Sequence, residues 1–241
     1  MPNPMTLLLY LKDSEANYLQ EFDGMVISNG PDFVVLDQTT FYPEGGGQPW
    51  DTGVLRWTGG ESRVLRVKKE GGVVKHFVDR MPEAPEVHGV IDWERRYAHM
   101  RMHSSQHLLS GVVWNLYKAR TMGNQIHEDF SRVDFAPANF TEADLHRIQG
   151  ECNRIISEMT PISIYEEGRS ELEAKIAEER AVLSMIPASI RKLRVIQIGD
   201  YDLCPCGGTH LRNTSEIGEI QITERKSKGR DTDRVAYKLN P

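Results

Sequence analysis

Apolar and polar residues alternate in short runs through the first ninety positions, and this period of two predicts strands. Glycine-rich or polar turns separate the runs, which cover residues 32–37, 53–57, 63–67 and 73–78. Short strands at this spacing favour a small barrel or curled sheet. The apolar run at residues 5–11 is too short to span a bilayer, so we expect a strand or a helix edge there.

A proline-rich polar stretch at residues 81–86 is typical of a linker. It places a boundary near residue 90, which predicts one domain at residues 1–90 and a second at residues 91–241. Helical character begins near Asp92 and continues to about Tyr117. Within it Leu108, Leu109, Val112, Val113 and Leu116 form one apolar arc. His103, His107, Ser110 and Trp114 fall on roughly the opposite side.

The remaining pattern mixes strands and helices. We expect a strand pair at residues 123–137 and a helix from a cap at Thr141 to about Met159, with Cys152 as an inert residue on its apolar stripe. A capping box at residues 170–173 predicts a second helix to about Met185. Further strands are expected at residues 162–165, 192–198, 216–223 and 234–239. Without strict βαβ order, this indicates an α+β fold.

Net charge and cysteine content narrow the functional classes. The 241-residue chain carries a formal charge of -6, which excludes a uniformly basic nucleic-acid surface but allows local basic patches. Two basic runs, at residues 191–194 and 225–230, are candidates, and we expect the second to lie between strands with Gly229 in a turn. Three cysteines make no disulfide framework, so we expect a cytoplasmic protein with no membrane partner.

Four nitrogen and sulfur side chains form a candidate metal site. His103 and His107 lie one turn apart on the predicted helix, and Cys206 and His210 repeat the same spacing about a hundred residues later. This donor set suits zinc. Ser104 stands where a zinc-protease helix carries its glutamate base, which excludes that class. A zinc ion held by four protein ligands is usually structural, whereas three ligands leave a position open for catalysis.

Cys204 complicates the choice of thiolate. We assign Cys206, because its spacing to His210 mirrors that of the histidine pair. Cys204 is then a neighbouring thiol or a substitute ligand. A second motif, residues 36–49, contains three successive glycines, Gly45, Gly46 and Gly47. It lacks the Lys-Ser/Thr ending of a phosphate loop, and its composition alone favours a plain β-turn.

Three stretches occur in one order: Leu36-Asp37-Gln38-Thr39-Thr40-Phe41-Tyr42-Pro43-Glu44-Gly45-Gly46-Gly47-Gln48-Pro49, then His103-Ser104-Ser105-Gln106-His107, then Cys206-Gly207-Gly208-Thr209-His210. In this combination the chain resembles the alanyl-tRNA editing family AlaX, in its medium-length class, related to the editing domain of alanyl-tRNA synthetase. The resemblance implies an N-terminal β-barrel followed by a two-layer α/β sandwich editing domain. It also implies hydrolysis of mischarged tRNA(Ala), chiefly Ser-tRNA(Ala), with Gly-tRNA(Ala) as a further candidate.

The resemblance also implies roles for individual residues. The implied zinc ligands are His103, His107, Cys206 and His210. Thr39 occupies the position that senses the serine hydroxyl, and Gly45, Gly46 and Gly47 would close over the aminoacyl end. Gln106 is expected to face the substrate by adjacency to a ligand. No catalytic side chain is assigned, because the expected chemistry is centred on zinc.

Three functional hypotheses remain. The first is a trans-editing hydrolase, the second a zinc-stabilised RNA-binding module without catalysis, and the third a metallohydrolase acting on a small ester or amide. A glycine-rich stretch headed by a threonine favours the first, since a mere binding module would not explain it. We expect the protein to act as a monomer on mischarged tRNA(Ala).

Overall fold

The computed structural model describes residues 5–176, 183 and 186–240. The chain divides into two compact units, Met1–His99 and Met100–Pro241. The division falls inside the long helix α1 (Trp93–Tyr117). Within the described residues, no helix combines the length and apolar character needed to cross a membrane.

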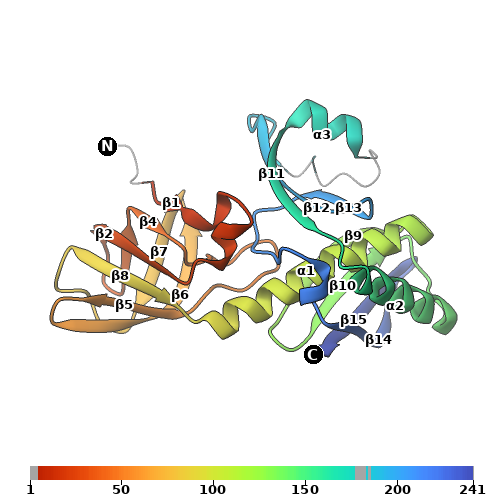
Figure 1. Ribbon diagram of the computed structural model, residues 1–241, viewed down its shortest axis with the longest axis horizontal. Helices are drawn as coiled ribbons and strands as arrows, with labels where there is room; N and C mark the ends of the chain where they lie inside the picture. Colours follow the sequence, from red (N-terminus) through yellow and green to blue (C-terminus); the bar gives the residue numbers. More distant parts are fainter. Residues whose placement is uncertain (1–4, 177–182, 184–185, 241) are drawn as a thin grey trace. The chain divides into compact units, whose positions relative to one another are not determined.

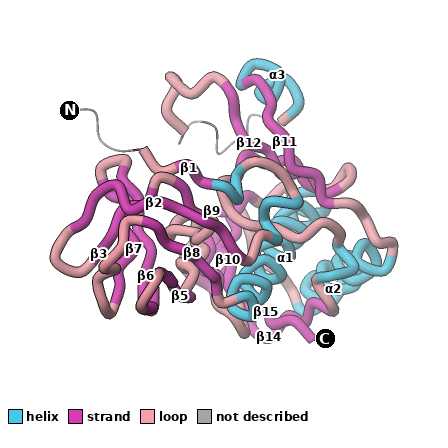
Figure 2. Tube along the Cα trace, turned by 60° about the vertical axis from the view of Figure 1, so that its left-hand side comes forward, coloured by secondary structure: helices cyan, strands magenta, loops and turns pink. Residues whose placement is uncertain are grey.

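Six strands of the first unit close into a barrel in the order β2-β3-β7-β6-β5-β8 (Figure 1; strands magenta in Figure 2). They are β2 (Glu21–Asn29), β3 (Phe33–Leu36), β5 (Gly53–Trp57), β6 (Gly60–Glu70), β7 (Val73–Val78) and β8 (Glu86–Ile91). The apolar residues of the alternating runs point inward and form its core, with Leu36, Leu55, Val64 and Val74 among them. The prediction of an α+β fold with an N-terminal barrel is confirmed.

Two segments of this unit were predicted differently from the sequence, or less fully. Residues 79–85 join β7 to β8, which both belong to the barrel, so the proline-rich stretch is a loop and the linker interpretation is wrong. The N-terminal apolar run forms β1 (Leu7–Leu8), which pairs in parallel with β4 (Gln38–Thr39), followed by the 3-10 helix η1 (Leu9–Leu11). A second 3-10 helix, η2 (Glu15–Tyr18), precedes β2.

A buried ion pair ties the glycine-rich segment to the start of α1. The Arg96 and Asp51 side chains have no solvent exposure, and the Arg96 Nε lies 2.9 Å from Asp51 Oδ2. The same carboxylate accepts a hydrogen bond from the backbone N–H of Tyr42 at 2.7 Å, which closes residues 42–51 into a loop. Arg96 also donates to the carbonyl of Asn17 at 3.0 Å. Both charges are therefore compensated inside the protein.

The second unit contains two sheets. A four-stranded antiparallel sheet has the order β14-β15-β10-β9, formed by β9 (Arg120–Ile126), β10 (Ser131–Ala136), β14 (Glu219–Gly229) and β15 (Thr232–Asn240) (Figure 1). Tyr237 of β15 donates its hydroxyl to the Met102 carbonyl of α1 at 3.0 Å. Asn153 of α2 (Glu142–Ser157) donates to the Ile220 carbonyl of β14, also at 3.0 Å. The helices and this sheet form two layers.

The smaller sheet has the order β11-β12-β13. Its strands are β11 (Ile162–Gly168), β12 (Lys192–Ile198) and β13 (Asp202–Pro205). The turn from β12 to β13 pairs Ile198 with Asp202 and Ile196 with Cys204. The short 3-10 helix η5 (Thr214–Glu216) follows before β14. The capping box predicted at Thr141 is confirmed, with Asp144 as its second member, and Cys152 is buried as expected.

The helix predicted from Ser170 is the main error in this unit. Helix α3 spans Arg169–Lys175, its cap residue is Gly168, and no side chain caps it. Ser170 therefore lies inside the first turn and does not cap the helix. The Arg169 side chain donates to backbone carbonyls, including that of Ile190 at 3.0 Å. The backbone at Ile176 is already extended, so α3 ends at Lys175, well before the predicted end near Met185. Most of the remaining predicted stretch lies outside the described residues.

Replacing one partner of the buried ion pair tests its contribution to stability. We expect Asp51→Ala to lower the free energy of unfolding by about 3 to 5 kcal/mol, because it leaves the Arg96 guanidinium buried without its counter-charge. Urea unfolding followed by circular dichroism measures the change. The matched control is Glu61→Ala, which removes the exposed pair with Arg56 and should cost less than about 1 kcal/mol. Equal losses in both variants would contradict this role.

Candidate metal centre

Two segments of the second unit bring four ligand side chains together. His103 and His107 come from α1, and Cys206 and His210 from the loop after β13. Their ligand atoms all lie within 4.8 Å of one another. The Cys206 Sγ is 3.6 Å from His103 Nε2 and 3.4 Å from His210 Nε2. These are the four residues that the sequence singled out, and the group can hold a metal ion.

The helix carries its two histidines into the interior. His103 and His107 are 2% and 5% exposed, although the sequence pattern placed them opposite the apolar arc. That interpretation of a two-sided helix is incomplete, because α1 is buried on both sides: Leu108, Leu109 and Val112 are buried as well. A polar stripe on a helix faces solvent only when no other part of the protein packs against it.

Backbone pairing between β12 and the following loop places Cys206. Its N–H donates to the Arg194 carbonyl at 3.1 Å, and Arg194 returns a guanidinium N–H to the Cys206 carbonyl at 2.7 Å. The Gly208 N–H points at the Cys206 sulfur at 3.3 Å. An amide donor of this kind stabilises a thiolate. Arg194, read from the sequence as part of a basic surface run, therefore belongs to the framework of the metal centre.

Neighbouring polar groups orient two of the imidazoles. Asp202 Oδ2 lies 2.8 Å from His107 Nδ1, and Ser104 Oγ lies 3.4 Å from His210 Nδ1. The Ser104 hydroxyl also accepts the Leu211 N–H at 3.0 Å. With Nδ1 engaged in this way, the Nε2 atoms remain for an ion, an arrangement typical of histidine–metal sites.

The electrostatics of the cluster suit ligands that must be deprotonated. Burial alone would raise the pKa of the Cys206 thiol, but His103 and His210 outweigh it and hold that pKa well below its ordinary value. Burial lowers the pKa of both His103 and His210, which favours neutral imidazoles. At His107 burial acts in the same direction, but Asp202 and Cys206 overcome it and raise its pKa to about 10. A metal ion would take the place of the proton at Nε2.

Cys204 stands outside this cluster. It lies in β13, opposite Ile196, with its sulfur 3.6 Å from the Pro205 carbonyl. The group of four that can hold an ion includes Cys206 and leaves Cys204 out. Three imidazole nitrogens and one thiolate sulfur are ligands that zinc prefers, whereas magnesium and calcium prefer oxygen.

Thr39 and the three successive glycines, which the sequence also predicted as site residues, lie in the first unit. Thr39 is buried in β4 of the first unit, and its hydroxyl lies 2.9 Å from His76 Nε2. The glycine-rich segment forms the β-turn that its composition favoured: Gly45 and Gln48 exchange backbone hydrogen bonds of 3.1 and 2.9 Å. Gly46 and Gly47 have φ angles of 59° and 87°, which side chains larger than glycine rarely adopt.

Gln106 belongs to a polar network between α1 and β9. Its amide nitrogen donates to Ser110 Oγ at 2.8 Å, and its amide oxygen accepts from Asn124 at 3.4 Å. Thr121 donates to the same Ser110 hydroxyl at 2.7 Å. These contacts hold the Gln106 amide in a defined orientation against the sheet. Its contact with a substrate stays a prediction.

Sequence reasoning missed Asp202 and His76. A carboxylate partner is expected for a metal-binding histidine, but Asp200 and Asp202 are equally placed in the sequence, and only the β12–β13 turn selects Asp202. In β7 His76 shares the face of Val74 and Val78, so the period of two, read strictly, would have placed it inward. Its burial follows from barrel closure.

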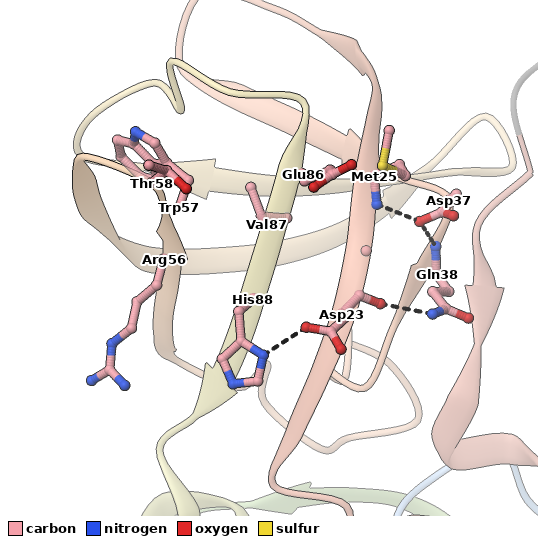
Figure 3. Close-up of a pocket in the computed structure, with 11 residues that line it drawn as sticks. Asp23, Met25, Asp37, Gln38, Arg56, Trp57, Thr58, Glu86, Val87 and His88 are labelled. Atoms are coloured by element: carbon pink, nitrogen blue, oxygen red, sulfur yellow. Dashed lines mark hydrogen bonds and ion pairs between the residues drawn. The ribbon is translucent and has the colours of Figure 1, made fainter.

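A depression of about 660 Å³ also opens on the barrel surface (Figure 3). Asp23, Asp37, Glu86 and His88 are among its lining residues, and none of the predicted site residues is. Its polar groups bond with one another: His88 Nδ1 lies 2.8 Å from Asp23 Oδ1, and Asp37 accepts the Met25 N–H at 2.7 Å. The Asp23 carboxylate raises the pKa of His88. We assign no ligand to this surface.

Removing the carboxylate behind His107 tests the metal centre without any activity assay. We expect Asp202→Asn to weaken zinc binding by roughly 10- to 100-fold, because the imidazole loses the group that orients it and increases its basicity. Competition with a chromogenic chelator measures the affinity. Asp200→Asn, an exposed neighbour, is the matched control and should bind zinc like the unaltered protein. Unchanged affinity in Asp202→Asn would exclude this role.

Two family models match parts of this chain. Residues 193–236 match the family described as Threonyl and Alanyl tRNA synthetase second additional domain, and residues 10–95 match tRNA synthetases class II (A). The chain is 40% identical over 234 residues to an alanine–tRNA ligase of Thermococcus kodakarensis, covering 94% of this chain and 25% of the ligase. It spans only that quarter of the ligase, so the ligase's activity as a whole is not attributed to it.

Relatives of matching length are the alanyl-tRNA editing proteins AlaX-M of Methanosarcina barkeri and Methanosarcina acetivorans. Both are 36% identical to this chain, over 244 and 246 residues, covering 98% of the chain and 99% of each relative. At this identity the match covers nearly the full length of both sequences. The chain belongs to the AlaX-M family of alanyl-tRNA editing proteins.

Proposed function

We propose that this protein is an aminoacyl-tRNA deacylase that hydrolyses mischarged tRNA(Ala), chiefly Ser-tRNA(Ala) and secondarily Gly-tRNA(Ala). The observation that carries the proposal is the cluster of His103, His107, Cys206 and His210 in a chain of the AlaX-M family. Zinc is the proposed ion. A cytoplasmic location and a monomeric state stay predictions.

The reaction needs little catalytic power, because an aminoacyl ester is already activated. Zinc held by the four ligands would supply a Lewis acid that orients the aminoacyl group. To polarise the ester carbonyl, the ion would have to take a fifth ligand or release one of the four. The protein's own part is to keep the His103 and His210 imidazoles neutral and the Cys206 thiolate ionised, as their pKa directions favour, whereas His107 would give up its proton to the ion. Asp202 holds His107 in the orientation that this requires.

Thr39 is the proposed sensor of the serine hydroxyl. Serine exceeds alanine by one hydroxyl group, and a larger pocket alone discriminates weakly against a smaller substrate. A buried polar atom that alanine leaves unpaired discriminates more strongly, because desolvation of that atom is not repaid. Gly45, Gly46 and Gly47 are proposed to close over the aminoacyl end, a role for which their turn provides the required backbone freedom.

The exposed part of β14 is the proposed contact surface for tRNA phosphates. Residues 225–229 of the basic run predicted between strands lie inside β14, which extends to Gly229, so that placement is wrong for all but Arg230. Arg225 is bound to Asp233 and Asn139, and Arg230 pairs with Asp231 at 3.8 Å, whereas Lys226 and Lys228 are exposed. Arg234 holds the pKa of the Asp134 carboxyl below its ordinary value, and the charges of Lys228 and Arg132 add to this. Lys226 and Lys228 are therefore the side chains proposed to contact phosphates.

A deacylation assay with two substrates tests the proposal. We expect the purified protein to release serine from Ser-tRNA(Ala) and to spare Ala-tRNA(Ala), and Thr39→Val to lose roughly tenfold or more of this discrimination. Radiolabelled aminoacyl-tRNA measures both rates. Thr40→Val is the matched control, because the Thr40 hydroxyl is buried too but donates to the Leu19 carbonyl. If a zinc-loaded protein deacylates neither substrate, the RNA-binding module without catalysis replaces this proposal.

The salt dependence of tRNA binding tests the basic surface. We expect Lys226→Gln and Lys228→Gln each to weaken binding and to reduce the slope of log affinity against log salt by about one, because each removes one phosphate contact. Filter binding at several salt concentrations gives the slope. Lys69→Gln, an exposed lysine of the barrel, is the control. An unaltered slope in both β14 variants would remove this strand from the interface.

A further inference from the structure

Ser110 presents a hydroxyl group on α1 one helical turn after the metal ligands. It follows His107 by three residues and His103 by seven, so the three side chains share one face of the helix. The Cβ atoms of residues three apart lie about 5 to 6 Å from each other, and helical side chains lean toward the preceding turn. The Ser110 side chain therefore leans toward His107. Unlike both histidines, Ser110 is only partly buried.

Two neighbours donate hydrogen bonds to the Ser110 oxygen. The amide nitrogen of Gln106 donates to Oγ at 2.8 Å, and Thr121 of β9 donates its hydroxyl at 2.7 Å. A serine hydroxyl has two lone pairs and one proton, so both of its acceptor positions are occupied. Its own proton has no acceptor in the part of the chain that the structure describes. Toward a ligand, Ser110 therefore acts only as a donor.

Asn124 sets the orientation of the Gln106 amide from its other end. The Asn124 amide nitrogen donates to Gln106 Oε1 at 3.4 Å, so the amide oxygen of Gln106 faces β9 and its amide nitrogen faces Ser110. Ser110, Thr121 and Asn124 are each partly exposed, so this network borders solvent. One proton is left over at the border of an otherwise satisfied network. That proton suits a ligand that offers an acceptor atom.

We propose that Ser110 is a catalytic residue that donates a hydrogen bond to the carbonyl oxygen of the aminoacyl ester. Gln106 and Thr121 are then positioning residues, because they occupy the lone pairs of Ser110 and leave only its proton for the substrate. The inference rests on the proposed deacylase function. Hydrolysis of an ester builds negative charge on the carbonyl oxygen, and a donor aimed at that oxygen stabilises the charge.

The reaction does not consume the Ser110 proton. The oxygen of a water molecule forms a bond to the carbonyl carbon, and the bond from that carbon to the ribose oxygen breaks. The ribose oxygen takes a proton from the water, which releases the free amino acid and the tRNA hydroxyl. Ser110 keeps its proton and shares it with the carbonyl oxygen throughout. Every aminoacyl ester carries this oxygen, so Ser110 contributes to rate and not to the choice of amino acid.

The first measurement compares two stable analogues of seryl-adenosine and involves no reaction. In one analogue an amide replaces the ester at the 3′ carbon, which keeps the carbonyl oxygen. In the other a methylene group replaces that carbonyl, which removes the acceptor. We expect Ser110→Ala to weaken binding of the amide roughly three- to tenfold and to leave binding of the methylene analogue unchanged. Isothermal titration calorimetry on the zinc-loaded protein gives both affinities. Equal effects of Ser110→Ala on both analogues would overturn the inference.

The second measurement separates kcat from KM for Ser- and Gly-tRNA(Ala). We expect Ser110→Ala to lower kcat roughly 100-fold, by the same factor on each substrate that the unaltered protein deacylates, with little change in KM. Ser110→Thr keeps the hydroxyl and should return kcat to within a few fold. Ser157→Ala is the matched control, because it removes an exposed helical hydroxyl that donates to the Arg154 carbonyl. Elemental analysis should find zinc unchanged in every variant.

Reversing one hydrogen bond tests the direction of the Ser110 proton. In Gln106→Glu a carboxylate, which only accepts, replaces the amide nitrogen, so the Ser110 hydroxyl would turn its proton inward. We expect kcat to fall as far as in Ser110→Ala, and the double variant to show no further loss, because both changes remove the same donor. A Gln106→Glu protein that keeps the kcat of the unaltered protein would overturn the positioning role.

The outcomes separate this inference from the function on which it rests. If the unaltered, zinc-loaded protein deacylates neither substrate, the proposed function fails, and the two analogues still decide whether Ser110 binds a carbonyl oxygen. Absence of binding to both analogues would then overturn the inference too. If the unaltered protein is active and Ser110→Ala keeps its kcat, the inference alone is overturned. A loss confined to the serine substrate, or one that Ser110→Thr does not restore, would also overturn it.

Discussion

The convergence of three imidazoles and one thiolate within 4.8 Å is the constraint on which the second unit depends. Unpaired charges in such a buried group repel one another or lose solvation, so the cluster is stable only when its protonation is controlled or an ion is bound. A rigid helix supplies two ligands at a fixed spacing, and β12–β13 pairing fixes the loop that supplies the others. Ser104 and Asp202 complete this arrangement from outside the ligand set.

A different kind of control operates at Thr39. No ion and no charged partner is needed there, because burial lowers the pKa of His76 to about 4 and leaves a neutral imidazole 2.9 Å from the hydroxyl. The energy involved is that of a single hydrogen bond.

Much of this was predictable from the sequence, and the failures have physical causes. Alternating apolar runs predicted most barrel strands, because they depend on local periodicity. The cluster was predicted from its donor types and from the equal spacing of its two pairs, His103 with His107 and Cys206 with His210. Burial of the polar side of α1 was not predictable, since a helix pattern does not say what covers its other face. Asp202 was missed because a turn register selects it over Asp200. Two predictions from basic residues were wrong. Arg194 hydrogen-bonds the Cys206 carbonyl and is not a free surface charge, and the basic residues after Glu224 continue strand β14.

Family membership and the cluster meet in one claim, that a metal ion held by these four side chains is the centre of an editing enzyme. Elemental analysis of the purified protein, paired with Ser-tRNA(Ala) deacylation before and after dialysis against a chelator, tests it most directly. The account predicts one zinc per chain, loss of activity when zinc is removed, and recovery when zinc alone is returned. A protein that deacylates Ser-tRNA(Ala) at an undiminished rate with no metal bound would contradict it.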